Sequence, residues 1–242
     1  MKIVFKQYIK RIGSLAILSA VLLVSCTDLE IKETDSIFSA GSEGFNGVED
    51  VAGSLTSLNN NIRGNLGDQA GTYALLTVST DEIFVPTRGT DWGDNGIWRS
   101  MHQHTFTPSH NHILTAWNQW NQAVFNASEI IDDRSNPSAE QAAEAKFLRA
   151  YSMYFVMDFF GQVPFRAPDE GPEITPKVLT RAEAYAFVLS DLDDAIAGLS
   201  STGPDLGKTR FATVEAAKFL KARVLLNSGV FLGTGAPDAA AL

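Results

Sequence analysis

The segment 79–112 holds the residues best suited to recognise a ligand. Five of them lie within eleven positions and are the predicted ligand-binding residues: Arg88, Asp91, Trp92, Asn95 and Trp98. Sugars present flat C–H faces and rims of hydroxyl groups, so a carbohydrate site combines exposed aromatic rings with charged or amide side chains that hydrogen-bond the rim. The alternative is that Trp92 and Trp98 only pack this segment against helices, as buried aromatic rings usually do.

The same segment contains all the histidines of the chain, in two His-x-His pairs: His102, His104, His110 and His112. Imidazole is a common ligand of zinc and copper, which makes these residues weak candidates for a metal site. No cysteine and no suitably spaced carboxylate completes a recognisable motif. We therefore predict loop or surface histidines, and neither a metal nor another cofactor.

Carboxylates in this segment do not predict an enzyme. Asp81 and Glu82 are adjacent, and Asp91 and Asp94 are close in sequence. Glycoside hydrolysis needs an acid and a base on opposite sides of the scissile bond, and proximity in sequence does not supply that geometry. A long aperiodic segment in a compact domain is nevertheless usually functional, which favours a binding role without catalysis.

The N-terminus has the pattern of an exported protein. Basic residues precede a predominantly apolar run at 12–24, which predicts a signal peptide over residues 1–25. Leu23-Val24-Ser25-Cys26 resembles the lipobox of bacterial lipoproteins, so Cys26 is the predicted lipid attachment site. Acyl chains would then anchor the protein to a membrane without spanning it. The polar, acidic stretch that follows predicts a lipidated tether over 26–40.

Charge and cysteine content narrow the classes of partner and the sources of stability. The formal net charge of −9 becomes −13 when the signal peptide and its four basic residues are removed. This acidic balance argues against nucleic-acid binding, which requires clustered lysine and arginine. Cys26 is the only cysteine, so the mature chain has no disulfide and its stability must come from packing.

The segment is positioned by a series of predicted helices. The central one lies in 145–165, where apolar residues recur every three or four positions until Gly161 and Pro164. The same spacing predicts five further helices, over 42–64, 68–78, 113–131, 180–199 and 213–229. Thr180 with Glu183 forms a predicted capping box, and Ser42 and Thr213 are predicted N-caps.

Helices that follow one another in this way predict an all-α fold of antiparallel pairs. The pattern favours a tetratricopeptide-like αα-superhelix with one long irregular loop, although no strict repeat period is present. We predict that residues 41–242 form this helical domain.

Several motifs together resemble the SusD/RagB family of outer-membrane nutrient-binding lipoproteins of the Bacteroidetes. They are the lipobox, the Asp81-Glu82 pair before a Trp-rich loop, KFLRAYSMY followed by FGQVP at 146–164, DLDDAIAGL at 191–199 and EAAKFLKARVLL at 215–226. The resemblance spans essentially the whole chain. Family members are commonly about twice as long, so the resemblance implies the N-terminal half of such a protein, probably truncated.

The resemblance implies a surface-exposed, lipid-anchored protein of the outer membrane that is not an enzyme. It implies binding of glycan or another nutrient and delivery to a SusC-like TonB-dependent transporter, and it places Arg88 and the tryptophans where relatives often contact ligand. The alternative is a helical protein-interaction scaffold that docks on a partner without binding sugar. That alternative predicts buried tryptophans in the loop and exposed apolar surface on the helices.

Overall fold

The computed structural model describes residues 44–171, 173–201 and 211–237. The chain divides into two units, Met1–Gly41 and Ser42–Leu242, and the described residues all belong to the second. The predicted signal peptide, Cys26 and the tether at 26–40 lie outside the described residues. Within the described part of the chain, no helix is long and apolar enough to cross a membrane.

The described residues are predominantly helical, which confirms the predicted all-α class. The helical elements are α2 (Val51–Gly67), the π-helix η1 (Ala74–Val78), the short η2 (Asp94–Gly96), α3 (Ile97–His102), α4 (Asn111–Ile131), η3 (Asp133–Ser135), α5 (Ala139–Phe160), α6 (Arg181–Gly198), α7 (Val214–Leu226) and α8 (Ser228–Phe231). A feature not predicted is the antiparallel ribbon of β1 (Gln162–Phe165) and β2 (Lys177–Thr180), which connects α5 to α6.

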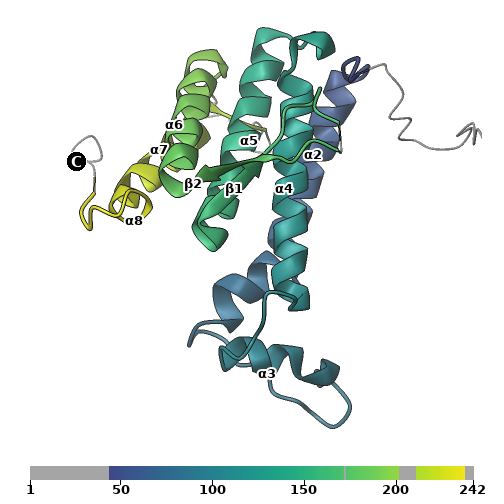
Figure 1. Ribbon diagram of the computed structural model, residues 1–242, viewed down its shortest axis with the longest axis vertical. Coiled ribbons are helices and arrows are strands. Elements are labelled where there is room, and N and C mark those ends of the chain that lie inside the picture. The colour runs from purple at the N-terminus through teal and green to yellow at the C-terminus, as the bar shows by residue number, and fades with distance from the viewer. Residues whose placement is uncertain (1–43, 172, 202–210, 238–242) are drawn as a thin grey trace, which may run out of the picture. The chain divides into compact units, whose positions relative to one another are not determined.

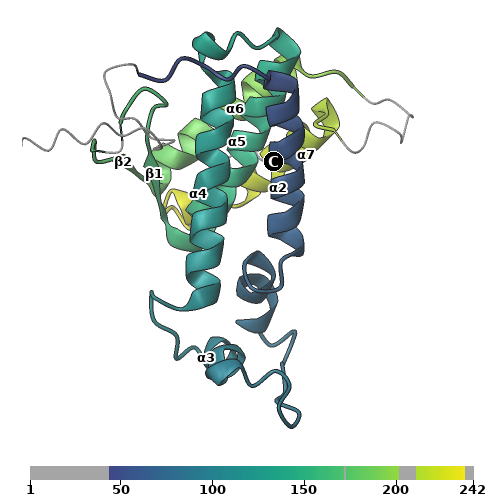
Figure 2. The ribbon, with the colours of Figure 1, turned by 90° about the vertical axis from the view of Figure 1, so that its right-hand side faces the viewer.

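Helices adjacent in sequence pack on one another. Helix α5 lies between α4 and α6, α2 packs on α4 and α5, and α7 packs on α6 (Figure 1). Seen from the side, α2 and α4 run alongside each other toward the segment that contains α3 (Figure 2). This arrangement places the irregular segment 68–110 at the C-terminal end of α2 and the N-terminal end of α4.

The ends of the two central helices are fixed by local sequence. Helix α5 begins with a capping box of Ser138 and Gln141. It ends at Gly161, whose φ of 75° is a left-handed conformation that glycine adopts without steric cost. Helix α6 begins with the predicted capping box of Thr180 and Glu183, which the structure confirms. The central helix is therefore delimited as its sequence indicates.

The core is centred on aromatic packing between α4 and α5. Trp120 is fully buried and stacks on Phe155, with ring centroids 4.3 Å apart and planes 15° apart. Its indole N–H donates to Thr72 Oγ1 at 2.8 Å, so the one polar atom of this ring is satisfied inside the core. Helix α5 is buried on the sides that face both α4 and α6, which makes it the central helix of the stack.

A buried ion pair joins α5 to α6. Arg149 donates from Nε and Nη2 to the two carboxylate oxygens of Asp191, at 2.7 and 2.8 Å. Both side chains are almost enclosed, with exposed fractions of 11% and 6%. The guanidinium also donates to Ser128 Oγ of α4 at 3.3 Å and lies 4.9 Å from the centroid of the Phe187 ring. One side chain of the KFLRAY motif thus links three helices.

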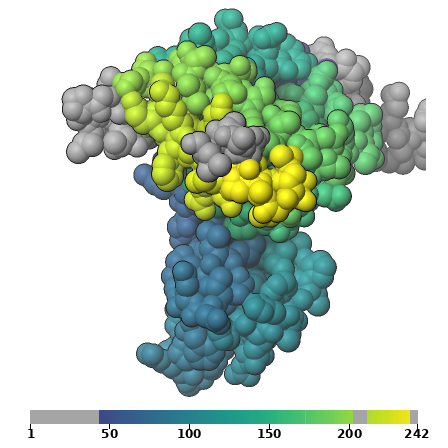
Figure 3. Space-filling view, turned by 90° about the vertical axis from the view of Figure 1, so that its left-hand side faces the viewer, coloured from purple at the N-terminus to yellow at the C-terminus, as the bar shows by residue number. Residues whose placement is uncertain are grey.

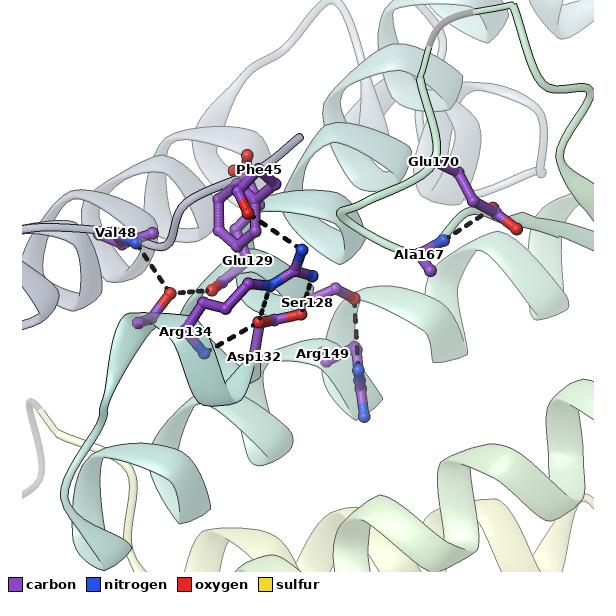
Figure 4. Close-up of polar contacts among 10 residues, drawn as sticks. Phe45, Val48, Ser128, Glu129, Asp132, Arg134, Arg149, Ala167 and Glu170 are labelled. Atoms are coloured by element: carbon purple, nitrogen blue, oxygen red, sulfur yellow. Dashed lines mark hydrogen bonds and ion pairs between the residues drawn. The ribbon is translucent and has the colours of Figure 1, made fainter. Parts of the chain in front are cut away.

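The chain enters the helical stack at the turn between α4 and α5 (Figure 4). Arg134 donates to the Phe45 carbonyl at 3.0 Å and covers the Phe45 ring at 5.0 Å, while Ser135 Oγ accepts the Val48 N–H at 2.8 Å. A side chain at Gly47 could not fit, because its Cβ would lie 2.1 Å from the Arg134 carbonyl oxygen. We call these contacts the entry latch.

Two predicted helix boundaries in the N-terminal part need correction. Helix α2 begins at Val51, because the Asp50 carboxylate accepts the Gly53 N–H as an N-cap. Phe45 and Val48 precede the helix and belong to the entry latch, and Ser42 lies outside the described residues. The predicted helix over 68–78 is a turn followed by the short π-helix η1.

Candidate functional site

The segment 68–110 folds around a small core of its own. Ala74 and Val78 of η1 pack with Trp98 and Met101 of α3, and all four are buried. This cluster is separate from the main core of the helical stack. We call this segment the lobe; its two ends are held by α2 and α4.

One face of the lobe carries a cavity of about 270 Å³. Nine residues line it: Gln69, Tyr73, Val78, Phe84, Val85, Pro86, Arg88, Trp92 and Trp98. Tyr73, Phe84 and Trp92 are exposed by 43%, 62% and 45%. The cavity is small for a ligand pocket, so it can enclose a single ring-sized group and leaves the remainder of a longer ligand outside.

The polar groups at this cavity are one guanidinium and one amide, from Arg88 and Gln69. Both are hydrogen-bond donors, and Gln69 can also accept. The side chain of Arg88 forms no ion pair with a described residue. Aromatic faces beside such donors form a chemically suitable surface for the C–H faces and hydroxyl groups of a sugar.

Local backbone geometry brings Trp92 to the cavity. Arg88 and Asp91 exchange two backbone hydrogen bonds, of 3.0 and 2.9 Å, which close a tight turn. The next residues include three non-glycine positions with positive φ: Trp92 at 58°, Asp94 at 35° and Asn95 at 54°. Asp and Asn tolerate this conformation, but a bulky tryptophan rarely adopts it. Such strain, of order 1–3 kcal/mol per residue, is characteristic of functional loops.

Trp98 forms the inner wall of the cavity. It is 5% exposed, and its indole N–H donates to Asp94 Oδ2 at 2.7 Å. Its ring meets Trp92 edge to face at 5.6 Å and lies 4.5 Å from the His112 ring, between centroids. The two tryptophans of the lobe therefore differ: Trp98 is a packed residue that borders the cavity, and Trp92 is half exposed.

His110 and His112 organise the start of α4. His110 Nδ1 accepts the His112 N–H at 3.2 Å, which leaves Nε2 to donate to the Ile97 carbonyl at 3.1 Å. His112 is fully buried, and its Nδ1 donates to the Ala70 carbonyl at 2.8 Å. Burial lowers the pKa of His112 below its ordinary value of 6.5, and the neighbouring His110 also lowers it, while the Ala70 carbonyl, Asp68 and Asp94 act in the opposite direction.

The other two histidines are held by the lobe as well. His104 Nε2 donates to the Ser79 carbonyl at 2.6 Å, and the His102 ring packs edge to face on Phe84 at 5.2 Å. Among the described residues, no group of three or more histidine, cysteine or acidic side chains is placed to hold a metal ion.

Comparison with known proteins decides the family. Residues 54–226 match the family model SusD-like_3, described as "Starch-binding associating with outer membrane". The chain belongs to the SusD-like family. The predicted SusD/RagB membership is thus confirmed, and the matched region extends from α2 to the end of α7.

Relatives of this SusD-like chain are more than twice as long. It is similar to the starch-binding protein SusD of Bacteroides thetaiotaomicron, with 23% identity over 246 residues that cover 94% of this chain and 43% of that protein. Among solved structures, a laminarin-binding SusD-like protein aligns with a TM-score of 0.63 and 18% identity, covering 77% of this chain and 41% of the other. Surface glycan-binding protein A from Bacteroides fluxus aligns with a TM-score of 0.58 and 23% identity, covering 74% and 40%.

The structure distributes the predicted site residues of the SusD-like chain into two groups. Arg88, Trp92 and Trp98 line the cavity, whereas Asp91 and Asn95 are exposed on the loop beside it and do not line it. Three lining residues were missed: Gln69, Tyr73 and Phe84. Tyr73 and Gln69 fall in a stretch whose spacing predicts an ordinary helix, and only the irregular turn of the lobe brings them to the loop.

A second exposed apolar surface lies far along the chain. On α7 and α8, Phe219, Leu226 and Val230 are exposed by 75%, 56% and 63%. Their spacing of seven and four residues is that of one helical face. Figure 3 views the molecule from the side on which α7 and α8 face the reader, with the lobe below them. The SusD-like chain therefore has apolar surface both on the lobe and on its last described helices.

Proposed function

We propose that this chain binds a glycan at the lobe cavity and does not act as an enzyme. The supporting observation is the half-exposed Trp92, which stands with Tyr73 and Phe84 around a cavity whose polar groups are Arg88 and Gln69. Carboxylates needed for hydrolysis are missing from the lining of this cavity, which favours capture over cleavage. Two relatives are named for binding starch or laminarin, which makes these neutral glucans the first ligands to test.

The binding test uses affinity electrophoresis of residues 27–242 in gels that contain laminarin or starch. Trp92→Ala removes an exposed ring at the cavity, and we expect binding roughly tenfold weaker, because a well-placed aromatic contact contributes about 0.5–1.5 kcal/mol beyond its buried area. Phe219→Ala is the matched control, since it removes an exposed ring on α7. A parent protein that is retarded by no glycan, or a Trp92→Ala variant retarded as strongly as the parent, contradicts this function.

We further propose that the protein is held on the cell surface by lipid at Cys26 and passes its ligand to a SusC-like TonB-dependent transporter. The family description, which refers to association with the outer membrane, supports this location. Cys26→Ala should move the protein from the membrane fraction to the soluble fraction. A transporter that never co-purifies with the lipidated protein from detergent-solubilised membranes would argue against delivery.

The exposed face of α7 and α8 favours a second candidate function, that of a helical scaffold for a protein partner. It would explain why Phe219, Leu226 and Val230 face outward. The two functions are separable. A scaffold predicts that Phe219→Asp abolishes co-purification of a partner while Trp92→Ala has no effect, and glycan capture predicts that only Trp92→Ala weakens retardation by glycan.

A further inference from the structure

We propose that Asp94 is a positioning residue: its carboxylate fixes the Trp98 indole, and Trp98 in turn fixes the Trp92 ring at the cavity. Asp94 does not line the cavity. It acts through a neighbour. The effect on glycan binding rests on the proposed function, but the effect on the position of Trp92 is independent of it.

The first step is the hydrogen bond between Asp94 and Trp98. The indole has a single polar hydrogen, and Trp98 is 5% exposed, so this N–H needs a protein acceptor. Asp94 Oδ2 provides it at 2.7 Å, the short distance of a charge-assisted bond. Asp94 begins η2 and Trp98 lies in the first turn of α3. The bond therefore fixes the Trp98 ring relative to the loop that carries Trp92.

The second step is the contact between the two tryptophans. Trp92 meets Trp98 edge to face at 5.6 Å, and no other aromatic ring among the described residues contacts Trp92. Trp98 is supported from its other side by His112, which is itself tied to the Ala70 carbonyl. The backbone of Trp92 does not favour its own conformation, because φ is 58°. The orientation of the half-exposed ring thus depends on Trp98.

The conformation of Asp94 allows a clean test. Its φ of 35° is costly for alanine but not for glycine, so Asp94→Gly removes the acceptor without adding backbone strain. Asp94→Asn keeps an acceptor oxygen and tolerates the same φ. Asn136→Gly is the matched control: Asn136 is exposed, has a φ of 48° and lies on the turn after η3.

The first measurement needs no ligand. The chain has four tryptophans, which 5-fluorotryptophan labelling makes visible by ¹⁹F NMR, with Trp92→Phe and Trp98→Phe used for assignment. We expect Asp94→Gly to shift the Trp92 and Trp98 signals and to increase the solvent isotope shift of Trp92. Asp94→Asn and Asn136→Gly should leave the Trp92 signal near that of the parent. An unmoved Trp92 signal in Asp94→Gly overturns the proposal.

The second measurement is the affinity for the glycan that the parent binds. We expect Asp94→Gly to weaken binding about tenfold, through the lost charge-assisted bond, and Asp94→Asn to restore most of the affinity. Equal losses in both variants would overturn the positioning role, because a retained acceptor would then be irrelevant. If the parent binds no glycan, the proposed function fails and the ¹⁹F result alone decides whether Asp94 positions Trp92.

Discussion

Asp191→Asn should be one of the most destabilising single-atom changes in this protein. The carboxylate accepts two hydrogen bonds from Arg149, at 2.7 and 2.8 Å, in a place where both side chains are almost enclosed. The substitution leaves the guanidinium buried without its counter-charge, and removal of one partner of a buried pair typically costs about 3–5 kcal/mol. Because Asn keeps the shape and one acceptor, we expect the free energy of unfolding to fall by about 3 kcal/mol.

The assay is urea unfolding followed by circular dichroism at neutral pH. The midpoint should fall while the denaturant slope stays constant, and the melting temperature should fall by about 6–12 °C for a domain of this size. Asp194→Asn is the control. Asp194 pairs with Lys146 at 2.7 Å, but this pair is largely solvent-exposed, and exposed pairs contribute about 0–1 kcal/mol.

Two results would refute this reasoning. The first is a loss of stability for Asp191→Asn no greater than that for Asp194→Asn. The second concerns the double variant Arg149→Met with Asp191→Leu, which removes both charges. It should be more stable than Asp191→Asn alone, because well-packed apolar residues avoid the desolvation cost of an ion. A double variant less stable than the single one would mean that the link among α4, α5 and α6 depends on the ion pair itself.

Two further predictions concern His112 and Gly161. The pKa of His112 is lowered in the folded state, so the unfolded state binds the proton more readily; the free energy of unfolding should decrease as pH falls below 6.5 toward the folded-state pKa, and His112→Gln should flatten this dependence in urea titrations between pH 5 and 8. Gly161→Ala should lower the melting temperature, because φ is 75° and the added Cβ would lie 2.8 Å from Arg181 Nη2; the loss should be about 1 kcal/mol by calorimetry, and an unchanged stability would show that the helix end relaxes freely.

The sequence predicts the helical stack well because its signals are local. The period of apolar residues, the capping box at Thr180 and the glycine at the end of α5 each act within a few residues, and the structure retains all of them. The start of α2 is less accessible. Phe45 and Val48 continue the helical spacing, but contacts with Arg134 and Ser135, almost ninety residues away, hold them in an extended segment.

The candidate site is predicted only in part for the same reason. Arg88, Trp92 and Trp98 are identified by residue type within one loop, yet spacing alone cannot tell that one tryptophan is half exposed and the other buried. That difference arises from the positive φ of Trp92 and from the hydrogen bond between Trp98 and Asp94. Tyr73 joins the cavity through the turn before η1, which no periodic pattern encodes.

The entry latch has a mechanical consequence. Tension on the chain ahead of residue 44 would, without the latch, act directly on Val51 and peel α2 away from α4. The contacts of Phe45 and Val48 with the turn after α4 divert this load into the end of α4 instead. The lobe lies at the other end of that helix, about 30 Å away for 21 residues that each rise 1.5 Å. A pulled chain would therefore strain the latch first and leave the aromatic cavity under little load.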